Sequence, residues 1–227
     1  MKKATKIILI IALLLVVGGI AFMQNYNYNE ISYTTLADTD IGSVEVGISG
    51  NESAPVAIAL ITGIHPRETL SIEPEIEAAK EYGNDNVKII NYKVTVTDHP
   101  DDYSIGRANG ESLVHDFVNP HVTSSDADAV IISHSHIASY GQGFYLATPE
   151  MDDVSVNIAG QINNTTDFNY YPVTGNETYK STSAVLVSKP IAQAGYPTFV
   201  YEIPEDISER TATDKTKELF DLIVSHL

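Results

Sequence analysis

Histidine and glutamate side chains follow three separate aliphatic runs in this chain of 227 residues. His65 and Glu68 follow VAIALITG, His134 follows ADAVIIS, and Glu202 ends the run TFVY. Acidic groups are costly inside a sheet unless they are paired, bound to an ion or functional. An HxxE spacing alone is more typical of a surface turn than of a site. Its recurrence with histidine and glutamate at two more strand ends predicts a functional site.

The residue types at these positions favour zinc chemistry. His65, Glu68 and His134 offer two imidazoles and a carboxylate, a donor set that holds one zinc ion and leaves a fourth position open for water. The sequence has no cysteine, so thiolate ligands and thiolate nucleophiles are excluded. Glu202 is predicted to act as the general base, taking a proton from the attacking water and delivering it to the leaving amine.

Substrate contacts are predicted in two other segments. In DYSIGRANGESL, Arg107 fits a substrate carboxylate bidentately and Asn109 donates to the same group, although a glycine-rich turn with an exposed arginine explains this segment equally well. His136, two residues after His134, is expected to line the pocket rather than bind the metal. No GxSxG motif, P-loop or GxGxxG motif is present.

The elements that position these residues alternate along the chain. Strands are predicted over 43–49, 55–62, 86–97, 127–135, 143–149 and 197–203, and helices over 73–83, 111–118, 182–195 and from Ser208 to the end. Several strands are continuously apolar, which is typical of a sheet covered on both faces. The pattern predicts an α/β fold with a mixed, mostly parallel sheet between helices, in which functional groups gather where strands end.

The amino-terminal segment is expected to lie outside this domain. Lys2, Lys3 and Lys6 precede an uncharged run over 7–23, which predicts a membrane anchor, or alternatively a cleaved signal, with everything that follows outside the cytoplasm. Residues 24–40 are interpreted as a stalk and 41–227 as a single domain. Without the three lysines the chain has 30 acidic and 10 basic residues, a formal charge of −20, which argues against nucleic acid as partner.

The order HPRE, then IISHSH, then FVYEIP resembles the zinc carboxypeptidase family and its succinylglutamate desuccinylase and aspartoacylase relatives. The resemblance covers roughly residues 54–203. It implies a sheet of about eight strands between helices, zinc on His65, Glu68 and His134, and Glu202 as the base. The Asn-Arg pair usual in the family is absent, and Arg107-Ala108-Asn109 is its altered replacement. Since the chain is compact, the family's substrate specificity cannot be carried over.

Three functions follow from these residues. The leading hypothesis is an extracytoplasmic zinc hydrolase that cleaves an amide or peptide bond with one zinc ion per chain. The second is a deacylase of N-acyl amino acids, and the third is a cell-surface binding module with a vestigial zinc site. Neither the substrate side chain nor the oligomeric state can be deduced from the sequence.

Overall fold

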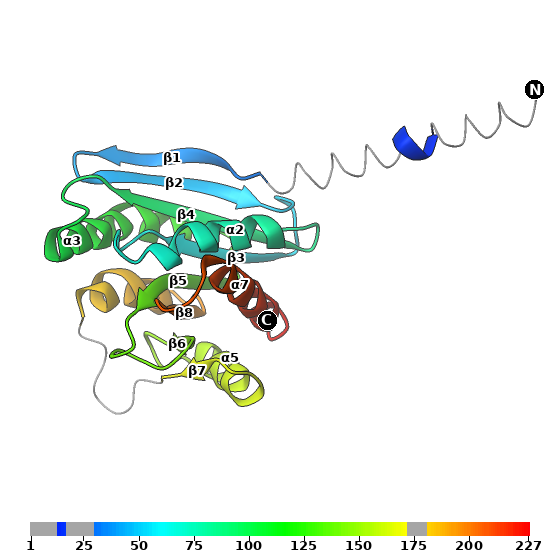
Figure 1. Cartoon of the computed structure of the whole chain (residues 1–227). Coiled ribbons are helices and arrows are strands. Elements are labelled where there is room, and N and C mark those ends of the chain that lie inside the picture. The colour runs from blue at the N-terminus through cyan, green and yellow to red at the C-terminus, as the bar shows by residue number, and fades with distance from the viewer. Residues whose placement is uncertain (1–12, 17–29, 172–180) are drawn as a thin grey trace, which may run out of the picture.

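The computed structural model describes residues 13–16, 30–171 and 181–227. Its central feature is an eight-stranded sheet with the strand order β1-β2-β4-β3-β5-β8-β6-β7 (Figure 1). The strands are β1 (Ser32–Thr39), β2 (Gly42–Ser49), β3 (Val56–Thr62), β4 (Val87–Val96), β5 (Ala129–His136), β6 (Tyr145–Ala147), β7 (Asn169–Tyr170) and β8 (Thr198–Pro204).

The centre of the sheet is parallel and its flanks are mixed. Strand β3 pairs in parallel with β4 and β5, and β5 pairs in parallel with β8. On the flanks, β2 is antiparallel to β1 and β4, and β6 is antiparallel to β8 and parallel to β7. The predicted mixed α/β sheet is thus confirmed.

Helices cover both faces of this sheet (Figure 1). One core joins the sheet to α2 (Glu73–Tyr82), α5 (Asp153–Thr165) and α7 (Glu209–Val224). The other core joins it to α3 (Tyr103–Leu113) and to the π-helical turns η2 (Val114–Val118) and η3 (Ala184–Ser188), which lead into α4 (Asn119–Val122) and α6 (Lys189–Gln193). Strand β3 shows why both faces are buried, because Ile58 and Leu60 belong to the first core and Ala59 and Ile61 to the second.

The predicted stalk is corrected at its carboxyl-terminal end. Ser32–Thr39 forms β1, which pairs with β2 in an antiparallel hairpin, so the domain includes these residues. Most of β1 is exposed or half-buried because it is the edge of the sheet. Its polar composition therefore hid it from a search for apolar runs.

One predicted helix is also corrected, and two further elements were missed. The helix expected over 111–118 begins at Tyr103, where the Asp102 carboxylate accepts hydrogen bonds from the amides of Ser104 and Ile105. Helix α5 and the two-residue strand β7 were not predicted. Helix α5 has a regular start, with the side chain of Asp152 accepting from the amide of Ser155.

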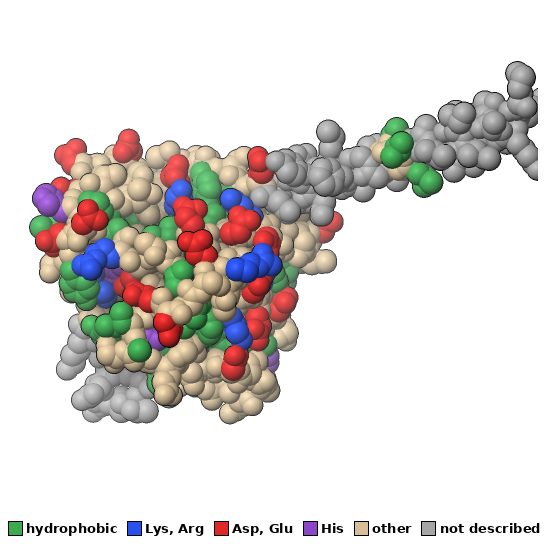
Figure 2. Space-filling model, in the orientation of Figure 1, with side chains coloured by type: hydrophobic (Ala, Val, Ile, Leu, Met, Phe, Trp, Pro, Cys, Tyr) green, Lys and Arg blue, Asp and Glu red, His purple; other side chains and the backbone are tan. Residues whose placement is uncertain are grey.

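Acidic side chains are spread over the face shown in Figure 2, with separate basic side chains between them. The predicted membrane anchor over 7–23 lies outside the described residues except for 13–16. Within the residues that the structure does describe, no helix is both long enough and apolar enough to cross a membrane.

Candidate metal centre and active site

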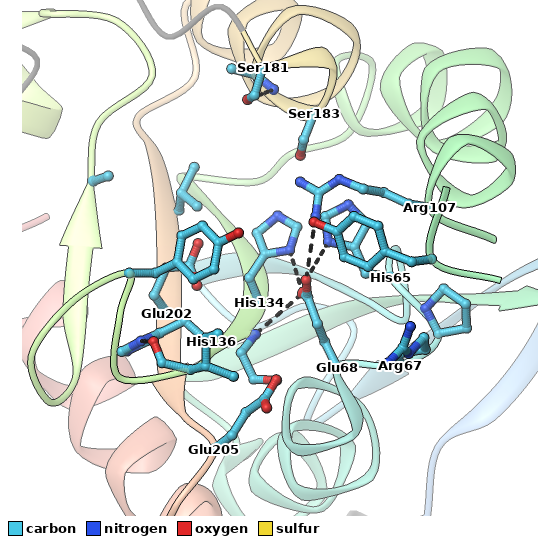
Figure 3. A pocket seen from close by; sticks show the side chains of 18 of the residues that line it. His65, Arg67, Glu68, Arg107, His134, His136, Ser181, Ser183, Glu202 and Glu205 are labelled. Atoms are coloured by element: carbon cyan, nitrogen blue, oxygen red, sulfur yellow. Dashed lines mark hydrogen bonds and ion pairs between the residues drawn. The ribbon is translucent and has the colours of Figure 1, made fainter. Parts of the chain in front are cut away.

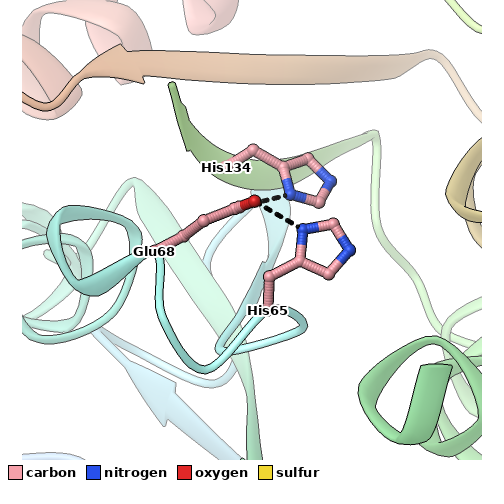
Figure 4. A group of neighbouring side chains, drawn as sticks. All are labelled: His65, Glu68 and His134. Atoms are coloured by element: carbon pink, nitrogen blue, oxygen red, sulfur yellow. Dashed lines mark hydrogen bonds and ion pairs between the residues drawn. The ribbon is translucent and has the colours of Figure 1, made fainter. Parts of the chain in front are cut away.

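His65, Glu68 and His134 meet at one wall of the molecule (Figure 4). Each offers a donor atom, and these three atoms all lie within 4.8 Å of one another. Nδ1 of His65 is 2.8 Å from Oε1 of Glu68, and Nδ1 of His134 is 2.9 Å from Oε2. The two imidazole rings lie side by side, with centroids 4.5 Å apart. Two imidazole nitrogens and a carboxylate that converge in this way suit a zinc ion.

Local backbone geometry brings the His65 loop to this place. Gly63, directly after β3, has a φ of 80°, and a Cβ atom there would lie 2.1 Å from the carbonyl oxygen of Val94. Only glycine fits such a turn against a neighbouring strand. Further along, the amide of Glu68 donates to the carbonyl of His65 and closes the turn that sets their i, i+3 spacing. His134 comes from β5, the strand next to β3.

A second carboxylate, that of Glu111, contacts His65 at the ring nitrogen that faces away from Glu68. Nε2 of His65 lies 3.3 Å from Oε1 of Glu111, a side chain that is buried on α3. Nε of Arg107, one helical turn earlier, lies 3.2 Å from the same oxygen, and its Nη1 lies 3.7 Å from Oε1 of Glu68. A carboxylate on the outer nitrogen of a metal-binding imidazole fixes its tautomer and orientation.

Helix α3 contacts this loop very closely. A Cβ atom on Gly110 would lie 1.7 Å from the carbonyl oxygen of Ile64, so the helix can approach the loop only with glycine at this position. Gly110 directly precedes Glu111 in the sequence. The same contact therefore sets the distance between Glu111 and His65.

The electrostatics of the cluster favour positive charge between its members. Burial acts to raise the pKa of Glu68, but His134 and His65 outweigh burial and hold that pKa well below its ordinary value. Burial acts to lower the pKa of His65, whereas its hydrogen bonds with Glu111 and Glu68 raise it above the usual range. A bound divalent cation would replace the protons on the two Nδ1 atoms and satisfy the same carboxylate. The donor set thus fits zinc.

Glu202 lies beside this group, on β8. It is aligned in register with His134 on β5, so the two side chains emerge at the same level of the sheet. Burial, with the negative charge of Glu68 adding to it, raises the pKa of Glu202 to about 7, against the opposing effects of His134 and Arg107. A carboxyl group that titrates near neutrality is suited to general acid–base chemistry.

A cavity of about 480 Å³ opens over these residues (Figure 3). It is lined by the three metal-binding candidates, by Glu202 and by Arg107, and it extends between Ser181 and Ser183 on one side and Glu205 on the other. With His136, six of the seven predicted site residues thus share one cavity. Its size is in the range typical of small-molecule and peptide sites.

His136 also lines the cavity, as predicted, and is not part of the metal group. Its Nε2 lies 2.9 Å from the carbonyl oxygen of Gly143 and its ring lies 4.9 Å from that of Tyr145. Ser135 lies between His134 and His136 on β5, where strand alternation would point it to the opposite face, yet it too lines the cavity. At the end of the sheet its amide reaches Glu68 and its hydroxyl reaches Glu205.

Asn109 is not brought to the cavity. Its amide nitrogen donates to the backbone carbonyl and the carboxylate of Asp98, at 3.0 and 3.1 Å. Because the segment is helical rather than a turn, Arg107 and Asn109 point in different directions. The predicted pairing of these two residues on one substrate carboxylate is therefore corrected to Arg107 alone.

Sequence reasoning missed several residues of the site. Glu111 follows Arg107 at the i, i+4 spacing of an ion pair, and recognising helix α3 would have revealed it. Tyr103, Tyr140 and Tyr145 also line the cavity. Glu205 follows Glu202 by three residues, but no sequence pattern distinguishes it from a surface acid.

No protein-family model matches the sequence, and no curated protein matches it either. Solved structures do match. A metallo-carboxypeptidase from Burkholderia cenocepacia has a TM-score of 0.57 at 15% identity, over 89% of this chain and 66% of its own. The product-bound cell shape determinant protein Csd4 from Helicobacter pylori has a TM-score of 0.52 at 11% identity, over 87% of this chain and 55% of its own. An aspartoacylase family protein from Mesorhizobium loti, at 0.49, is too distant to support an argument.

The chain spans slightly less than two thirds of the length of the Burkholderia protein and about half that of Csd4. At such low identity these similarities establish the fold. The resemblance that the motifs suggested is confirmed at that level: this chain has the α/β fold of the metallo-carboxypeptidases, in a compact form.

Proposed function

We propose that this protein is a zinc-dependent hydrolase of an amide or peptide bond. One observation carries the proposal: the donor atoms of His65, Glu68 and His134 converge within 4.8 Å on the wall of a cavity that Glu202 also lines. The fold of metallo-carboxypeptidases supports it.

The chemistry divides between the metal and the chain. Zinc held by these ligands would supply Lewis acidity, which polarises a carbonyl group and makes a water molecule easier to deprotonate. Glu202, in its ionised form, takes the proton of the attacking water and passes it to the leaving nitrogen. Arg107, whose guanidinium faces the cavity, pairs with a carboxylate of the substrate or with the developing oxyanion.

Metal content and turnover test this proposal together. We expect one zinc ion per chain by elemental analysis, with anomalous scattering at the His65, Glu68 and His134 side chains. Hydrolysis of unblocked peptides should be lost on chelation and restored by zinc. Metal found elsewhere in zinc-replete protein, or activity that survives chelation, would contradict the proposal.

The nature of the acyl group separates peptidase from deacylase. Assaying peptides and N-acyl amino acids side by side would assign one of the two reactions. Zinc-loaded protein that captures these ligands without converting them would instead identify a binding module.

We also propose that the domain works outside the cytoplasm. The support is the sequence of residues 1–23, in which three lysines precede an apolar run. Protease added to intact cells should digest the domain, and protection until the cells are lysed would contradict this placement.

A further inference from the structure

Glu205 places a carboxylate in the cavity, and a single residue, Ser135, lies between it and the metal group. Its amide donates to the carbonyl oxygen of His136 at 2.9 Å, which extends the pairing of β5 and β8 by one position and fixes its backbone. The Ser135 hydroxyl donates to its Oε1 at 3.3 Å, while the Ser135 amide donates to Glu68 at 3.3 Å. Ser135 thus connects the two carboxylates.

The negative charge of Glu205 is not neutralised within the described part of the chain. Across residues 30–171 and 181–227, the Ser135 hydroxyl is the one side chain bonded to its carboxylate, and no ion pair is formed. Both arginines of the cavity interact elsewhere, Arg107 with Glu111 and Arg67 with the ring of Tyr103. A fixed, accessible carboxylate without a cation is complementary to a cationic ligand.

Glu205 and Arg107 lie on opposite sides of the metal group. In Figure 3, Arg107 and Ser183 lie on one side of the Glu68 carboxylate, and Glu205 lies on the other. In the proposed reaction Arg107 can pair with a carboxylate of the substrate, and we place that carboxylate on the leaving portion. The acyl portion then extends toward Glu205.

The distance restricts which group of the substrate can reach this carboxylate. Because the amide and hydroxyl of one serine are about 3 Å apart, Ser135 allows at most roughly 10 Å between the bonded oxygens of Glu68 and Glu205. An extended peptide advances about 3.5 Å per residue. The group that meets Glu205 therefore belongs to the first or second residue on the acyl side of the cleaved bond.

We propose that Glu205 binds the terminal ammonium group of short, unblocked peptides, and so determines specificity on the acyl side. This inference rests on the proposed hydrolase function and narrows it. Substrates with a free amine one or two residues before the cleaved bond are preferred. N-acetylated or N-succinylated substrates, which lack the positive charge of the ammonium group, are disfavoured.

The test compares two tripeptide libraries of equal composition, one with free amino termini and one acetylated. Cleavage by the zinc-loaded enzyme is followed by mass spectrometry, and binding is followed by calorimetry with the zinc-loaded Glu202→Gln variant. We expect roughly five- to tenfold tighter binding and faster cleavage of the free library at pH 6.5. The preference should disappear above about pH 8 to 9, where the α-ammonium loses its proton.

Variants at one position assign the effect to this carboxylate. Glu205→Gln should remove the preference, Glu205→Asp should retain part of it, and Glu205→Lys should favour N-succinyl ligands. Asp206→Asn is the matched control, because it removes one charge from the neighbouring exposed position, which does not line the cavity. The control should behave as the wild type.

The outcomes distinguish this inference from the proposed function. Equal cleavage of both libraries, or a preference that persists in Glu205→Gln, overturns the inference and leaves the hydrolase function intact. If neither library is bound or cleaved by zinc-loaded protein, both fail. A preference that Glu205→Gln and Asp206→Asn reduce equally would reflect the net charge of the domain and would also overturn the role of Glu205.

Discussion

Glu202 and Glu75, two glutamates on opposite faces of the sheet, have similarly raised pKa values and entirely different surroundings. Glu202 lines the cavity beside the candidate metal-binding cluster, whereas Glu75, on α2, is fully buried in the core beneath α7. Burial raises the pKa of each to about 7. Tyr201, the neighbour of Glu202 on β8, belongs to the core on the side of α2 and α7. Because successive side chains of a strand face opposite sides of the sheet, Glu202 faces away from the core that holds Glu75.

The difference lies in what the released proton can reach. Around Glu202 there are His134, Arg107 and the open cavity. Around Glu75 there are hydroxyl groups: Thr216 donates to its Oε1, and Thr216 and Ser133 both act to lower its pKa against the larger effect of burial. A carboxyl group with a raised pKa is thus a candidate base only where substrate and water have access. At the closed position the same shift affects stability.

The largest expected effect is on turnover. Glu202→Gln should reduce kcat about a thousandfold, because general-base catalysis is lost while the ligands of the metal are unchanged. In the wild type, kcat/KM should rise with pH as Glu202 ionises, with the limb at or below about pH 7 since bound zinc favours the carboxylate. Stopped assays with equal zinc loading check this, and full activity in the variant would remove Glu202 from the mechanism.

Glu75→Gln should change stability and leave turnover unaltered. The folded-state pKa is raised, so the neutral form stabilises the fold fully below about pH 4.3, and this contribution is lost as pH rises to about 7. The variant should therefore gain on the order of 3 kcal/mol relative to the wild type between pH 4 and pH 8. Urea unfolding of both proteins at several pH values measures the gain. A difference that does not depend on pH would show that Glu75 is ionised in the core.

Glu111→Gln should weaken zinc binding by roughly 10- to 100-fold, because an amide orients the His65 imidazole less strongly than a carboxylate. Competition with a chromophoric chelator gives the affinity. Turnover at saturating zinc should change little, which separates this residue from Glu202. Glu209→Gln, at an exposed position on α7, is the control and should bind zinc as the wild type does.

The smallest effect is expected at Asn109. Asn109→Ala should change KM and kcat less than about twofold, since its amide bonds to Asp98 outside the cavity. Arg107→Lys, two residues earlier, should raise KM about tenfold because the bidentate fork is lost. Steady-state kinetics on one peptide compare them, and equal effects would restore the pairing that the sequence suggested.

The parts of the fold that can be predicted from the sequence are those with strong local patterns. Continuous apolar strands such as β3 and β5 are evident, and so are the candidate metal ligands that follow them, because burial and strand ends are local properties. The start of α3 was missed because Gly106 and Gly110 suggest a turn, whereas both glycines meet backbone atoms of other segments. Glu111 was missed together with this helix. Its partner His65 is 46 positions away, so no local sequence pattern connects the two residues.

The contact between Gly110 and the carbonyl of Ile64 limits how the sequence can vary. A library of substitutions at position 110 should contain almost no folded, zinc-binding clones, although the residue touches neither metal nor cavity. Helix α3 and the His65 loop must then diverge together, because a change in one is accepted only if the other still fits it. In related sequences, glycine at this position should therefore accompany the HxxE ligands wherever Glu111 is retained.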